Sequence, residues 1–214
     1  TFAVPQENQR QFFGNKGAET LFKEAIAELT RMGGKELAID YGPFLETNDF
    51  MFNGPWLAER LVSVGQFILE EPDALHPVTR EIILGAGKYS AGELIEGLHR
   101  LKELHNHISG LLDSINVMVV PTAGTIYRIH EVEADPITLN ANMGYYTNFV
   151  NFLDLAAIAV PNGFLSNGSA MGITFIGPAF SDSYLAGLGG AFCGRRVDRL
   201  GATDIPIPES SDPE

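Results

Sequence analysis

Hydrophobic side chains recur with a helical period in several parts of the chain. In the segment 18–32 they fall three or four positions apart and two glycines follow, so the pattern predicts one helix. The segment 91–115 shows the same period over a longer stretch, with charged residues between its leucines. Further helices are predicted at 43–70, with an interruption near Gly54 and Pro55, at 76–84 and at 182–196.

Three runs of consecutive hydrophobic residues predict strands in the second half of the chain. They are Val117–Val120, Ala157–Val160 and Met171–Ile176, and each stops at a proline or a Gly-Pro pair. Runs without alternation are typical of strands buried on both faces. Two shorter strands, at 2–4 and 35–40, flank the first predicted helix and favour a β-α-β unit with a parallel strand pair.

Strands that alternate with helices predict an α/β fold with a mostly parallel or mixed central sheet between helical layers. In such sheets ligands bind where loops leave the carboxyl ends of the strands. We expect those loops to begin at Pro121 and Pro161. Residues 1–202 are predicted to fold as one unit, and residues 203–214, which are acidic and rich in proline and serine, to form a tail or linker.

The charge balance narrows the class of partner. The 214 residues include 14 Lys and Arg against 27 Asp and Glu, for a formal net charge of −13. A surface this acidic repels phosphate groups, which argues against nucleic acid and against an anionic membrane as partners.

The ends of the chain and its cysteine content bear on its compartment. The single cysteine, Cys193, excludes an internal disulfide bond and fits a reducing compartment, so we expect a cytoplasmic protein. The N-terminal residues lack the pattern of a signal peptide, and no hydrophobic run approaches the length of a membrane span. The chain starts at Thr1, so we expect it to begin inside a longer protein or to have been processed.

Two features suggest chemistry. The segment 121–127 offers hydroxyl groups and a glycine at a strand end, which suits a pocket for a small polar substrate or, equally, a tight turn whose hydroxyls bond the local backbone. Arg60 follows an interruption in an apolar and aromatic segment. Such an arginine needs an anionic partner from the protein or a ligand, unless its methylene groups pack on the apolar residues while its guanidinium reaches water.

Other short patterns predict no site. The segment 85–88 lacks the residues that a phosphate-binding loop needs and is interpreted as a helix terminator. His99, His105 and His107 do not pair at metal-ligand spacing, so no metal site is predicted. Cys193 shows no neighbouring base and is interpreted as a small core residue.

Longer motifs resemble the allophanate hydrolases of the amidase signature family. The segments that carry the resemblance are Gly54–Arg60, Val119–Tyr127, Glu131–Pro136, Tyr146–Gly163 and Gly172–Asp182. It extends over residues 2–189, nearly the whole chain. It implies an α/β/α sandwich with a mixed central sheet, and hydrolysis of allophanate to ammonia and carbon dioxide without a metal or organic cofactor.

The resemblance also implies that the catalytic residues lie elsewhere. The family uses a Ser–cis-Ser–Lys triad: one serine attacks the amide carbonyl, the second relays the proton and the lysine acts as base. The lysine and the Gly/Ser-rich signature belong to the N-terminal half of the amidase domain, and this sequence has no Gly-Gly-Ser-Ser-Gly-like segment. The chain therefore resembles the C-terminal half, has no catalytic residue of its own, and is predicted to be inactive alone.

For substrate binding, the resemblance implies a role for five residues. Arg60 matches the family position that holds the substrate carboxylate, where a planar guanidinium can bind two oxygens. Phe52 stands eight residues earlier, where the family usually has tyrosine, and the lost hydrogen bond is worth about 1 kcal/mol. Thr125, Tyr127 and Asn148 are expected to line the same pocket.

The expected partners are a small anionic urea-derived substrate and the missing N-terminal half of the domain. Half of a sheet leaves an unpaired edge and an uncovered face, so the chain alone is predicted to aggregate or to form a homo-oligomer. The alternative is a non-catalytic remnant that serves as a binding or interaction module.

Overall fold

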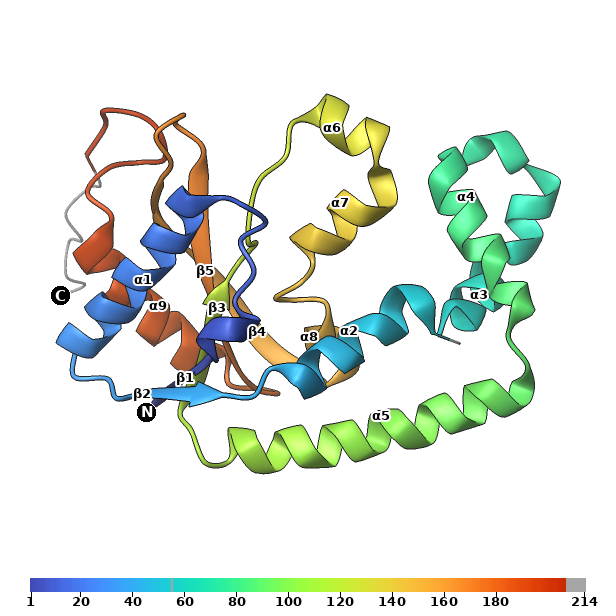
Figure 1. Cartoon of the computed structure of the whole chain (residues 1–214), viewed down its shortest axis with the longest axis horizontal. Coiled ribbons are helices and arrows are strands. Elements are labelled where there is room, and N and C mark those ends of the chain that lie inside the picture. The colour runs from blue at the N-terminus through green and yellow to red at the C-terminus, as the bar shows by residue number, and fades with distance from the viewer. Residues whose placement is uncertain (55, 207–214) are drawn as a thin grey trace, which may run out of the picture.

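The computed structural model describes residues 1–54 and 56–206; the side chains of residues 51–53 lie outside the described part. At its centre is a mixed sheet of five strands in the order β2-β1-β3-β5-β4 (Figure 1). The strands are β1 (Phe2–Pro5), β2 (Glu36–Ile39), β3 (Val117–Pro121), β4 (Leu155–Phe164) and β5 (Ala170–Pro178). β1 pairs in parallel with β2 and β3, whereas β5 pairs antiparallel with β3 and β4, so the predicted mixed sheet and parallel β-α-β unit are confirmed.

Helices cover both faces of this sheet. Helices α1 (Lys16–Arg31) and α9 (Asp182–Arg196) pack on one face, where Phe22, Phe175 and Phe192 belong to one buried cluster. Helices α2 (Gly42–Asn53), α5 (Ala91–Leu112) and α8 (Phe149–Phe152) pack on the other face, around Tyr41, Phe44 and Met118. The predicted α/β/α sandwich is confirmed.

Local sequence explains where the long helices begin and end. The side chain of Asn15 accepts a hydrogen bond from the amide of Ala18 at 3.0 Å and so caps α1. Gly33, with φ of +93°, follows the end of α1 in the left-handed conformation that glycine adopts without strain. Ser90 and Glu93 form a reciprocal capping box at the start of α5.

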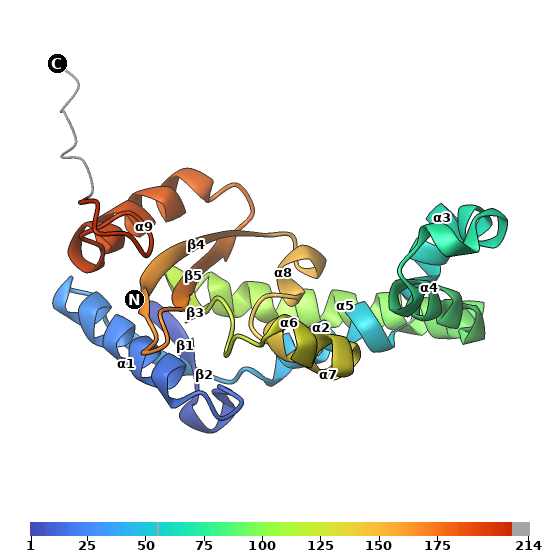
Figure 2. The ribbon, with the colours of Figure 1, turned by 90° about the horizontal axis from the view of Figure 1, so that it is seen from above.

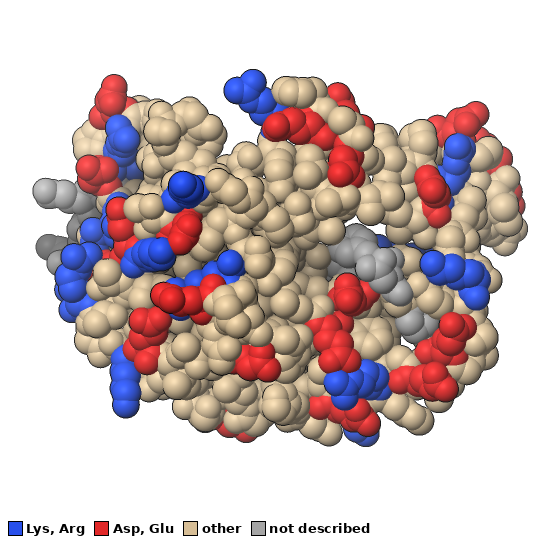
Figure 3. All heavy atoms as spheres, in the orientation of Figure 1, with Lys and Arg blue, Asp and Glu red and all other residues tan. Residues whose placement is uncertain are grey.

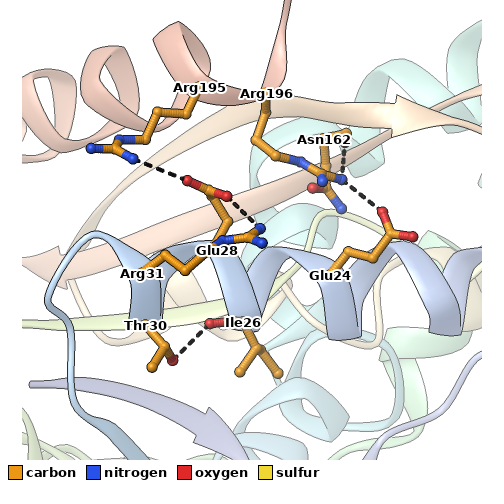
Figure 4. A network of polar contacts seen from close by, with 8 residues as sticks. All are labelled: Glu24, Ile26, Glu28, Thr30, Arg31, Asn162, Arg195 and Arg196. Carbon is orange, nitrogen blue, oxygen red and sulfur yellow. Dashed lines mark hydrogen bonds and ion pairs between the residues drawn. The ribbon is translucent and has the colours of Figure 1, made fainter.

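An ion-pair network joins α1 to α9 across the surface of the first cluster (Figure 4). Glu28, only 7% exposed, contacts both Arg31 and Arg195. Arg196 contacts Glu24 at 3.1 Å and donates to the carbonyl oxygen of Asn162 at 2.8 Å. The network therefore ties the last helix to α1 and to β4.

A helical arm extends away from the sheet (Figures 1 and 2). Helices α3 (Leu57–Glu70) and α4 (Pro77–Leu84) form it, and α5 leads from its far end back to the sheet. Helices α6 (Ile129–Ala134) and α7 (Pro136–Met143) lie in the connection from β3 to α8. Short 3₁₀ turns occur at Glu7–Gln9, Pro72–Ala74 and Gly85–Lys88. Among the described residues, no helix combines the length and hydrophobicity needed to cross a lipid bilayer.

The prediction for the run 157–160 is partly wrong. The run does form a strand, but β4 lies at an edge of the sheet, and Ala157 and Ala159 are exposed where burial on both faces was expected. Pro161 lies inside β4 and does not end it, because an edge strand tolerates a residue without an amide proton. A bulge lies between Pro161 and Gly163, and β4 continues to Phe164, so no functional loop begins at Pro161.

The expectation that one face of the sheet is uncovered is wrong. Both faces carry helices, and the exposed parts of the sheet lie in its two edge strands, β2 and β4. Of the predicted tail, residues 203–206 are described: Pro206 forms a β-bridge with Arg199, and residues 207–214 lie outside the described part.

Candidate functional site

The carboxyl ends of the parallel strands β1 and β3 lie side by side and send two loops, 6–15 and 122–128, to the same edge of the sheet. The loops touch at Gly124. A Cβ atom there would lie 2.3 Å from the carbonyl oxygen of Gln11, so only glycine allows this contact. Phe13, in the first loop, has a φ of +50°, an uncommon conformation for a non-glycine residue.

Three tyrosines hold the loop 6–15 in place. The hydroxyl of Tyr146 accepts a hydrogen bond from the amide of Gln11 at 2.7 Å and donates to its carbonyl at 3.1 Å. Tyr145 donates to the carbonyl of Gln9, and Tyr41 donates to that of Tyr146. Burial raises the pKa of all three hydroxyls, so they are neutral hydrogen-bonding groups and not bases near neutral pH.

The structure places Thr125 beneath these loops. Its side chain is buried, and its hydroxyl accepts a hydrogen bond from the side-chain Nδ2 of Asn15 at 3.3 Å. The hydroxyl of Thr122 likewise lies 2.9 Å from that of Thr174 on β5. Both hydroxyls therefore bond side chains from distant parts of the chain, and neither makes the bond to the local backbone that a tight turn would predict.

Asn148 lies at a hollow of about 330 Å³ between α2, α7 and the start of α8. The carboxamides of Asn48, Asn142 and Asn148 line it, and we name it the carboxamide hollow. Tyr127 is linked to it because Asn142 donates a hydrogen bond to the Tyr127 hydroxyl at 2.9 Å. Of the residues that the sequence analysis placed in one pocket, Asn148 lines this hollow, and Tyr127 contacts one of its lining residues.

Arg60 occupies a separate hollow of about 260 Å³, the arginine hollow, lined by Trp56, Glu59, Arg60, Asn151 and Phe152. The side chain is exposed, and its guanidinium makes no ion pair with any residue of the described part. The rings of Trp56 and Phe152 pack edge to face at 5.4 Å and form the apolar side of the hollow. Phe52, predicted to act with Arg60, has its side chain outside the described residues.

Residues at α8 line both hollows. Asn148, the N-cap residue of α8, lines the carboxamide hollow, and Asn151 lines the arginine hollow. Residues three apart on a helix are neighbours, with Cβ atoms about 5–6 Å apart. The sequence analysis did not identify Asn48, Asn142 or Asn151. Asn151 could have been identified from its position three residues after Asn148.

Neither hollow contains a recognisable catalytic pair. The hydroxyl of Ser109 lies 3.4 Å from Nδ1 of His105, but both are exposed on α5, away from the hollows. Cys193 is half-buried on α9, and burial raises the pKa of its thiol, opposite to what a nucleophile needs. Within the described ranges, no group of three or more His, Cys, Asp or Glu could hold a metal ion.

Charge surrounds the hollows unevenly. On the face seen in Figure 3, most charged side chains lie over α1 at one end and over α5 and the helical arm at the other. Glu46, beside the carboxamide hollow, is bound by Arg100 at 2.6 and 2.9 Å, which lowers the pKa of this carboxyl. The arrangement offers a cation at one hollow and neutral amides with nearby carboxylates at the other.

Comparison with known proteins shows the family of this chain. The model of the amidase family matches residues 5–185, which include both hollows. The chain belongs to the amidase family. Urea amidolyase of Saccharomyces cerevisiae is 35% identical over 184 residues, which are 85% of this chain and 10% of the yeast protein.

Solved structures of two related proteins are also similar to this amidase-family chain. Allophanate hydrolase of Kluyveromyces lactis is 33% identical, with a TM-score of 0.90 over 97% of this chain and 35% of that protein. Urea amidolyase of K. lactis is 33% identical, with a TM-score of 0.91 over the whole of this chain and 13% of that protein. The chain therefore spans about a third or less of the length of these relatives.

Proposed function

We propose that this amidase-family chain is part of an enzyme that hydrolyses a small urea-derived carboxylate, most simply allophanate, to ammonia and carbon dioxide. In this proposal the chain binds the substrate, and a Ser–cis-Ser–Lys triad from the rest of the amidase domain performs the chemistry. The unpaired guanidinium of Arg60 at the arginine hollow is the observation that carries it. The names of the relatives at 33–35% identity support the substrate class.

The reaction follows from the residue types of the proposed triad. The first serine attacks the amide carbonyl, so a C–O bond forms and the C–N bond breaks. The second serine passes a proton to the nitrogen, which leaves as ammonia, and the lysine accepts the proton of the attacking serine. Water then hydrolyses the acyl-enzyme to N-carboxycarbamate, which loses carbon dioxide to give carbamate. The carbamate breaks down to a second carbon dioxide and a second ammonia.

Arg60 has the properties needed to hold the substrate carboxylate. Its planar guanidinium can donate two parallel hydrogen bonds to the two oxygens of one carboxylate. No described side chain competes for it, and the edge-to-face pair of Trp56 and Phe152 reduces the access of water on one side. With Phe52 in place of the family's tyrosine, Arg60 would carry more of the carboxylate binding than in the family pattern.

The test uses the protein encoded by the complete reading frame that contains this chain. We expect ammonia release from allophanate, and weaker release from malonamate and biuret. Replacing Arg60 by alanine should cost about 2–3 kcal/mol, or roughly 30- to 150-fold in kcat/KM, mainly through a higher KM. Arg199→Ala, at the far side of the sheet, is the matched control.

Two results separate the proposal from its rival. A folded protein that carries the triad but releases no ammonia from any of the three amides would overturn the hydrolase function. The rival is a non-catalytic binding module, favoured by the lack of a catalytic pair in the hollows. It requires that the reading frame encode neither the lysine nor a Ser-Ser-Gly segment upstream of Thr1.

A further inference from the structure

We propose that the carboxamide hollow binds the neutral carbamoyl end of the substrate, while Arg60 binds its carboxylate. This assignment rests on the proposed function and deepens it, because it names the residues that would select a urea-type group. Asn48 is the residue that would contact the nitrogen of the carbamoyl group.

Asn48 has a buried acceptor that lacks a donor. Its Nδ2 donates to the carbonyl oxygen of Tyr145 at 2.7 Å, which fixes the orientation of the carboxamide. Its Oδ1 is buried and has no hydrogen-bond partner among the described residues. A buried acceptor without a donor is unfavourable, so a group that brings an N–H into the hollow gains a hydrogen bond at no loss elsewhere.

The two other carboxamides are also fixed by their surroundings. Asn142 donates to the hydroxyl of Tyr127 at 2.9 Å, which leaves its oxygen as an acceptor. Asn148 packs against Gly144 so closely that a Cβ atom there would lie 2.2–2.6 Å from three atoms of its side chain. Three oriented carboxamides thus provide acceptors and donors without net charge, which matches the polarity of a carbamoyl group.

Charge decides which end of the substrate enters which hollow. Glu46 and Asp49 also line the carboxamide hollow, so a carboxylate there would face like charges. The arginine hollow holds the guanidinium of Arg60, and the carboxylate of Glu59 lines it as well. Asn148 and Asn151 lie three positions apart at α8, with Cβ atoms about 5–6 Å apart, so the two hollows border neighbouring positions of one helical turn.

The test compares two substrates that differ only in the leaving group. Malonamate has a carbamoyl nitrogen, whereas its analogue monomethyl malonate has a methoxy oxygen and no N–H. In the complete protein, Asn48→Leu should lower kcat/KM for malonamate about tenfold and leave the ester within about twofold, because only the amide loses an N–H···O bond. Asn140→Leu, on α7 outside both hollows, is the control and should change neither.

The outcomes distinguish this inference from the proposed function. Equal losses on amide and ester would overturn the role of Asn48 and leave the hydrolase function intact, whereas no turnover by the unmodified protein would point against the hydrolase function itself. If Asn48→Leu does not fold, NMR titration of the unmodified protein with malonamate replaces it. Shifts of the Asn48 and Asn148 side-chain amide signals support the inference, and shifts confined to Arg60 overturn it.

Discussion

Replacing Gly124 by alanine tests whether the loops 6–15 and 122–128 form one rigid unit. The added Cβ would lie 2.3 Å from the carbonyl oxygen of Gln11 and 3.1 Å from the ring of Phe13. The loop can yield only by giving up bonds, because Tyr146 holds both the amide and the carbonyl of Gln11. Overpacking costs about 1–3 kcal/mol, and one lost hydrogen bond adds about 1 kcal/mol, so we expect a loss of about 2–4 kcal/mol in the free energy of unfolding.

Chemical denaturation followed by circular dichroism measures this change. Gly110→Ala is the matched control, since the same methyl group on α5 meets nothing within 4 Å. It should raise the free energy of unfolding by about 0.5–1 kcal/mol, because alanine favours a helix over glycine. The reasoning fails if Gly124→Ala loses less than about 0.5 kcal/mol while the control behaves as expected.

Three further predictions concern single features of the fold. Hydrogen bonds from Gln9, the larger cause, and from Gly42 lower the pKa of Asp40 below its ordinary value of 3.8. Their contribution to the free energy of unfolding should therefore be complete above pH 3.8 and disappear as the pH falls further. In acid unfolding, Asp40→Asn should lack this pH-dependent loss of stability. Burial raises the pKa of Cys193, so iodoacetamide should alkylate it more slowly at pH 8 than it alkylates a cysteine peptide, and an equal rate would contradict the burial. The chain alone should self-associate through the exposed edge of β4, and a monomer in size-exclusion chromatography that persists on dilution would count against this.

The fold was largely predictable because its strongest signals are local. The helical periods of 18–32 and 91–115 report which face of each helix is buried, and they locate α1 and α5 within a few residues. The position of β4 was not predictable in this way. Hydrophobicity reports the residue type, but Ala157 and Ala159 are exposed because the sheet ends at β4, which depends on pairing between distant segments.

The candidate site was likewise predictable only where the sequence signal is local. Arg60 could be singled out because a charged residue within an apolar segment is a local anomaly, and the structure places it in a hollow. Asn48 could not be singled out in this way, since its partner Tyr145 lies 97 positions along the chain and an asparagine in a predicted helix is unremarkable by sequence. Ser181 shows the limit of local signals: it is the N-cap residue of α9, yet its hydroxyl bonds the carbonyl of Pro178 and caps nothing.

The described residues around α8 favour binding over chemistry. The polar groups that line the two hollows are a guanidinium, carboxamides and carboxylates, and their tyrosine neighbours are held neutral by burial. The guanidinium and the carboxamides orient a substrate but supply neither a nucleophile nor a base near neutral pH. On the proposed function, this chain would determine which small amide is accepted, through Arg60 at one end and Asn48 at the other. The triad would then need only to attack whichever carbonyl lies between them.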